Sequence, residues 1–136
     1  MTDPAAETLS VLLEQDFPHP PEKIWRALTQ PHLLEEWLMK TDFAPVVGRA
    51  FRFSAEWGAV GGKVLDAEPH RSLSYTWGDD HLKSIVTWTL TPTGTGTRLR
   101  LEQTGFRADQ PRYFQGAKAG WPRFLANLEQ VLARTE

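Results

Sequence analysis

The chain has 136 residues, a formal net charge of −2 and no cysteine. A nearly neutral chain lacks the basic surface that nucleic acids and anionic membranes require, and the lack of cysteine excludes disulfides, thiol nucleophiles and cysteine-ligated zinc. Because the N-terminus has no signal-peptide pattern and no apolar run reaches the roughly 20 residues of a membrane span, we expect one cytoplasmic domain over residues 1–136, with a loose terminus over 1–8.

The N-terminal third predicts one strand followed by two short helices. Apolar and polar residues alternate over 8–17, which indicates a strand. The prolines of PHPPEK end this strand, and proline is tolerated in the first turn of a helix. Pro31 cannot continue that helix and therefore begins a second one. The apolar faces of the two helices are formed by Ile24, Trp25 and Leu28 and by Leu34, Trp37 and Leu38.

The middle of the chain predicts five further strands. Apolar and polar residues alternate within 51–57, 64–68, 72–77, 86–91 and 98–102. The segment 64–68 has the weakest pattern and is bounded by the glycines at 61–62 and by Pro69. Turn residues at 78–80 and 92–96 separate later strands. One apolar and one polar face per strand is typical of an antiparallel sheet with one face in solvent.

The C-terminal segment predicts a long helix, over about 110–134, that contains helix breakers. Apolar residues recur at helical spacing from Tyr113 to Leu132. Gly116, Gly120 and Pro122 lie within this pattern, although each weakens a helix. We expect the helix to bend near 116–122 and its small residues to border a cavity. In the alternative interpretation, residues 107–119 are largely a loop and the helix begins at Trp121.

The order strand, two helices, five strands and long helix resembles a known superfamily. It is similar to the SRPBCC superfamily, which has the helix-grip fold of START domains and the birch-pollen allergen. The chain resembles the branch that contains the C-terminal domain of the heat-shock-protein-90 ATPase activator. The segments that carry this resemblance are FPHPPEKIWRALTQPHLLEEW at 17–37, VGRAFRF at 47–53, GKVLDAEPHRSLSYTW at 62–77, SIVTWTLTPTGTGTRLRLEQTGF at 84–106, and GW followed by FLANLEQVL at 120–132.

The resemblance implies an α+β helix-grip fold. A curved antiparallel sheet, of six strands here in the order β-α-α-β5-α, would wrap around the long C-terminal helix and leave a cavity between them. Members of the superfamily bind hydrophobic ligands, cyclise polyketides or have no assigned role. The resemblance therefore implies a fold and a cavity without implying one activity.

Metal and cofactor sites are not predicted. The four histidines, at 19, 32, 70 and 81, have no metal-binding helical spacing. The sequence Asp79-Asp80-His81 has metal-ligating residue types, but aspartate at a hairpin tip is favoured for its turn chemistry. No nucleophile elbow or phosphate-binding glycine motif occurs. We therefore predict no metal, no cofactor and no catalytic residues.

An enzyme is the alternative to this prediction, because some polar residues fall on the predicted apolar faces of strands. By the alternation along each strand, these residues are Gln15, Asp66, Glu68 and Gln103. If Asp66 and Glu68 faced a cavity, burial could raise the pKa of either carboxyl, as an enzyme of the cyclase or hydratase class would need. Tyr113 is a third acid–base candidate for that class. In the competing interpretation the weak strand is inverted or irregular, with Leu65 and Ala67 inward and both acids in water, because unpaired acids are rarely buried.

The six Trp and seven Phe residues are the remaining functional signal. Trp and Tyr combine an apolar body with a polar tip, which suits a site that orients a ligand. The competing interpretation is a packed aromatic core. We predict non-catalytic binding of a small hydrophobic or amphipathic molecule by Trp57, Tyr75, Trp77, Trp88, Phe106, Tyr113, Ala117 and Trp121. A chaperone-binding module is a further alternative, and the pattern leaves both a monomer and a homodimer open.

Overall fold

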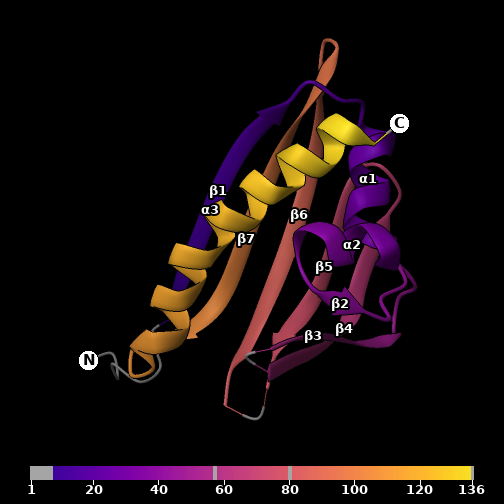
Figure 1. Cartoon of the computed structure of the whole chain (residues 1–136). Coiled ribbons are helices and arrows are strands. Elements are labelled where there is room, and N and C mark those ends of the chain that lie inside the picture. The colour runs from indigo at the N-terminus through magenta and orange to yellow at the C-terminus, as the bar shows by residue number, and fades with distance from the viewer. Residues whose placement is uncertain (1–7, 57, 80, 136) are drawn as a thin grey trace.

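The computed structural model describes residues 8–56, 58–79 and 81–135. In chain order, the elements are β1 (Thr8–Phe17), α1 (Pro21–Thr29), α2 (Pro31–Trp37), β2 (Lys40–Thr41), β3 (Ala50–Ala55), β4 (Gly58–Glu68), β5 (Ser72–Gly78), β6 (Lys83–Thr93), β7 (Gly96–Arg107) and α3 (Pro111–Arg134). The long helix α3 crosses one face of the sheet, and α1 and α2 cover another part of that face (Figure 1). This is the α+β helix-grip arrangement that the sequence predicts.

The sheet is antiparallel, with the strand order β1-β7-β6-β5-β4-β3-β2. It has seven strands within the described residues, so the prediction of six was wrong by one. The additional strand, β2, is two residues long and pairs with β3 through Lys40 and Thr41. Two residues are too few to show an alternating pattern, so no periodicity in the sequence indicates this strand.

The glycines at 61–62 lie within β4, not before it as predicted. β4 begins at Gly58 and pairs with both β3 and β5. A Cβ atom on Gly62 would lie 1.8 Å from the Thr76 carbonyl oxygen of β5. Glycine therefore allows the two backbones to approach closely here and does not mark a strand end.

A β-bulge in β4 determines where two carboxylates lie. Val64 pairs with Tyr75 but Asp66 pairs with Ser74, so one extra residue is inserted between them. Because side chains alternate along a strand, this insertion moves Asp66 and Glu68 to the outer face. Both are exposed, and the Ser72 hydroxyl donates to them at 3.5 and 3.4 Å. The expectation of both acids in water is confirmed, and the hypothesis of inward acids is wrong. Of the two residues expected inward in their place, Ala67 is half-buried but Leu65 is 44% exposed, so that part of the interpretation was wrong for Leu65.

The helix α3 is continuous over 24 residues. The alternative loop over 107–119 is therefore wrong, and the bend near 116–122 stays a prediction. The buried stripe of α3 lies in its second half, where the side chains pack on the sheet and on α1 and α2. That stripe consists of Trp121, Leu125, Leu128, Val131 and Leu132. Within the described residues, no helix is long and apolar enough to cross a membrane.

The first half of α3 borders open space. A Cβ atom added to Gly116 would meet nothing within 4 Å, and one added to Gly120 would meet only a ring carbon of Phe124, at 3.7 Å. Packing therefore does not require glycine at either position, although each glycine costs the helix about 1 kcal/mol relative to alanine.

Candidate functional site

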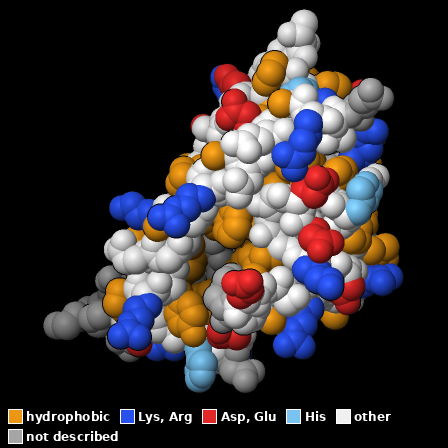
Figure 2. Space-filling model, in the orientation of Figure 1, with side chains coloured by type: hydrophobic (Ala, Val, Ile, Leu, Met, Phe, Trp, Pro, Cys, Tyr) orange, Lys and Arg blue, Asp and Glu red, His pale blue; other side chains and the backbone are white. Residues whose placement is uncertain are grey.

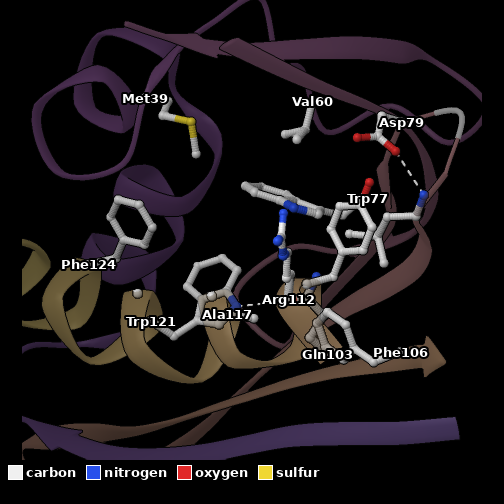
Figure 3. Close-up of a pocket in the computed structure, with 14 residues that line it drawn as sticks. Met39, Val60, Trp77, Asp79, Gln103, Phe106, Arg112, Ala117, Trp121 and Phe124 are labelled. Atoms are coloured by element: carbon white, nitrogen blue, oxygen red, sulfur yellow. Dashed lines mark hydrogen bonds between the residues drawn. The ribbon is translucent and has the colours of Figure 1, made fainter. Parts of the chain in front are cut away.

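A cavity of about 360 Å³ lies between the first half of α3 and the sheet. This volume is in the range of sites for small molecules. β4, β5, β7 and α3 contribute most of its wall, and Met39 closes it from the segment after α2 (Figure 3). Apolar side chains surround a hollow beside this part of α3 in Figure 2. The lining residues are Met39, Val60, Trp77, Asp79, Leu82, Gln103, Phe106, Arg112, Tyr113, Gly116, Ala117, Gly120, Trp121 and Phe124.

The structure brings together five of the eight side chains predicted to contact a ligand. The five that line the cavity are Trp77, Phe106, Tyr113, Ala117 and Trp121. Tyr75 and Trp88 are buried in the core behind it, where the Trp88 indole Nε1 donates to the Tyr75 hydroxyl at 2.9 Å. Burial raises the pKa of Tyr75, partly offset by that hydrogen bond. Trp57 lies outside the described residues.

Several lining residues were not predicted. Met39 and Leu82 come from segments between regular elements, where no periodic pattern indicates direction. Arg112 lies in the first turn of α3 and lacks an apolar signal. Gln103 was noticed only as a polar residue with inward parity, and it is indeed buried, at 1% exposure.

A chain of buried hydrogen bonds fixes the aromatic wall. The Trp121 indole Nε1 donates to the Gln103 side-chain oxygen at 2.6 Å, and the Gln103 amide donates to the Ser84 hydroxyl at 2.9 Å. Ser84 in turn donates to the Trp77 carbonyl at 2.6 Å. Each of the three side-chain donors in this series of hydrogen bonds therefore has an acceptor, which avoids the cost of burying an unsatisfied polar group.

The two indoles of the wall also contact each other and their neighbours. The centroid of the Trp121 ring system lies 5.6 Å from those of Trp77, Trp88 and Phe124. Edge-on and tilted contacts at this separation are favourable for aromatic pairs. Because the indole nitrogen of Trp121 is already bonded, the wall presents chiefly ring carbon to the cavity.

Polar groups gather instead at the β5–β6 side and at the start of α3. One carboxylate oxygen of Asp79 accepts from the backbone N–H groups of His81 and Leu82, at 2.7 and 2.8 Å. These bonds lower the pKa of Asp79. Desolvation, followed by the charge of Asp79, raises the pKa of Tyr113. Asp79 thus acts as a turn residue, while Asp80 of the Asp79-Asp80-His81 motif lies outside the described residues.

The family model described as "Activator of Hsp90 ATPase homolog 1-like protein" matches residues 18–133. The chain belongs to this family. No match was found among curated proteins.

Solved structures of the family type share the fold over most of their length. The protein MLL2253 from Mesorhizobium loti is 57% identical, with a TM-score of 0.91, covering 94% of this chain and 99% of that one. CalU16 from Micromonospora echinospora is 26% identical, with a TM-score of 0.79, and the match covers 98% of this chain and 82% of CalU16. The Aha1 dimer from Colwellia psychrerythraea has the same fold, at 20% identity and a TM-score of 0.83. The match covers 91% of this chain and 96% of the Aha1 chain.

Proposed function

We propose that this member of the Activator of Hsp90 ATPase homolog 1-like family binds a small amphipathic molecule in the cavity between the sheet and α3, without catalysis. The observation that carries the proposal is the aromatic-lined cavity of about 360 Å³ beside Gly116 and Gly120. Glycines that weaken a helix without being required by packing are understandable if they keep space for a ligand. Such a trade of stability for function is common at binding sites.

The distribution of polar groups supports an amphipathic ligand. Around Gln103 and Trp121, the buried polar atoms bond to one another and leave an apolar surface. Asp79, Arg112 and Tyr113 line another part of the cavity, and all three are at least partly exposed to solvent. A ligand with an apolar body and one polar end would match both parts.

The enzyme alternative has little support from the positions of its acids. Asp66 and Glu68, which a cyclase or hydratase mechanism would have used, lie on the outer face of the sheet. Tyr113 alone of the three acid–base candidates lines the cavity, and its raised pKa disfavours the phenolate that a general base would need. We therefore propose binding in preference to catalysis.

Native mass spectrometry of the protein, purified gently from its own host, tests the proposal. We expect a reproducible small-molecule adduct that is lost on denaturation, because a cavity closed by aromatic rings retains an apolar ligand. Trp121→Ala should lose the adduct, whereas the exposed Val47→Ala should keep it. Capture of the heat-shock-protein-90 chaperone by a protein with no adduct would instead favour the chaperone-binding alternative.

A further inference from the structure

Arg112 is a positive charge at an aromatic cavity without a partner in the described part of the chain. Its side chain extends from the first turn of α3 into the cavity, toward the Trp77 indole (Figure 3). No hydrogen bond or ion pair joins it to any described residue. Arg98, Arg107 and Arg134 each lie within 3.2 Å of a carboxylate oxygen, whereas Arg112 has no such partner among the described residues and is the arginine that lines the cavity.

The other charged residue of the cavity does not neutralise Arg112. Asp79 forms no ion pair with it among the described residues, and the Asp79 oxygen Oδ1 already accepts two backbone N–H groups. The groups that shift the pKa of Asp79 are its hydrogen-bond donors, its own desolvation, His81 and Tyr113. The five N–H donors of the Arg112 guanidinium are therefore available to a ligand.

The chemistry of a guanidinium selects the polar end of that ligand. Its planar fork binds carboxylate, sulfonate-like or phosphate oxygens with two parallel hydrogen bonds, and such charge-assisted bonds are stronger than neutral ones. Arg112 is itself exposed to solvent, whereas Trp77 and Phe106 of the same cavity are buried, so the ion pair would supply selectivity for an acid and the apolar wall most of the affinity.

We propose that the cavity recognises an organic anion, with its acidic group bound by Arg112 and its apolar body packed against Trp77 and Trp121. This rests on the proposed function and adds the chemical class of the ligand. Arg112 is then the residue that distinguishes an acid from a neutral molecule of the same shape. The negative charge of Asp79 disfavours an anion near the β5–β6 turn and so reinforces the position beside α3.

Two fluorescent probes with one ring system test this assignment. 8-Anilinonaphthalene-1-sulfonate carries an anionic group that N-phenyl-1-naphthylamine lacks. In the wild-type protein, we expect both to bind saturably and the sulfonate to bind more tightly. Arg112→Gln should weaken the sulfonate about ten-fold, as expected for loss of a charge-assisted bond, and change the neutral probe less than about two-fold. Arg112→Lys should restore part of the difference.

The control is Arg123→Gln, which removes the same charge from an exposed position about three turns further along α3, outside the cavity. It should leave both probes unaffected. If both probes bind but Arg112→Gln changes them equally or not at all, the assignment of Arg112 is overturned and the proposed cavity binding stands. If neither probe binds the wild-type protein, the proposed function itself fails. Thermal unfolding of each variant verifies that its fold is intact.

Discussion

The double variant Gly116→Leu/Gly120→Leu is expected to lose at least about ten-fold in affinity for N-phenyl-1-naphthylamine, while its free energy of unfolding does not fall. An added Cβ atom meets no backbone at either position, so the new side chains have room to enter the cavity. Two leucine side chains would occupy much of its volume of about 360 Å³. Leucine also favours a helix more than glycine does, by roughly 0.7 kcal/mol per residue. Fluorescence titration and urea denaturation measure the two effects.

Ala119→Leu is the matched control for this variant. Ala119 is exposed on the same stretch of α3 and does not line the cavity. It should leave affinity unchanged, because its leucine is added to the exposed face of the helix, away from the cavity. Wild-type affinity in the double variant would show that the space beside Gly116 and Gly120 is not where the probe binds. If the double variant binds the probe more weakly and is at least as stable as the wild-type protein, the presence of Gly116 and Gly120 in α3 is explained by ligand binding.

Gln103→Leu is expected to reduce the free energy of unfolding by about 3 kcal/mol, because it leaves the buried Trp121 indole N–H without an acceptor and removes one of the two hydrogen bonds of the Ser84 hydroxyl. The Trp121 indole N–H would lose its acceptor, and the Ser84 hydroxyl would lose the donor from the Gln103 amide. Leucine is similar in size, so the loss reports hydrogen bonding more than volume. Urea denaturation measures the effect.

Two further variants separate the hydrogen bond from general disruption. Gln15→Leu removes a half-exposed glutamine whose side-chain amide donates to the Glu129 carboxylate at 3.4 Å, and it should change stability by less than about 0.5 kcal/mol. Adding Trp121→Phe to Gln103→Leu removes the stranded indole donor and should cost less than the sum of the single changes. If the losses in free energy of unfolding were additive, or if Gln15→Leu lost as much stability as Gln103→Leu, the stabilising role of the buried hydrogen bonds of Gln103 would be contradicted.

The fold was predictable because its elements are long and strongly patterned. The alternation over 8–17 and the proline at 31 correctly predict β1 and the break between α1 and α2. Helical spacing also indicates α3, even across Pro122. The short strand β2 and the bulge after Val64 could not be predicted from sequence periodicity, because both depend on how a strand pairs with its neighbour.

The site was predictable only in part. Strand parity placed Tyr75 and Trp77 on the same inner face, but parity cannot show which of them meets a cavity. Their separation depends on where α3 crosses the sheet, since Tyr75 packs against Phe51 while Trp77 faces Trp121. Arg112 follows no apolar pattern, so its position at the cavity emerges only when the first turn of α3 is placed in three dimensions.

The most direct test of cavity binding is a nuclear magnetic resonance titration that follows the indole N–H signals with N-phenyl-1-naphthylamine. Trp77 and Trp121 line the cavity, whereas Trp25 and Trp37 are buried elsewhere in the core, the latter donating to the Ala27 carbonyl at 2.8 Å. We expect saturable shifts of the Trp77 and Trp121 signals, with those of Trp25 and Trp37 nearly unchanged. Saturable binding that shifts Trp25 or Trp37 but leaves Trp77 and Trp121 in place would contradict it, as would the absence of binding.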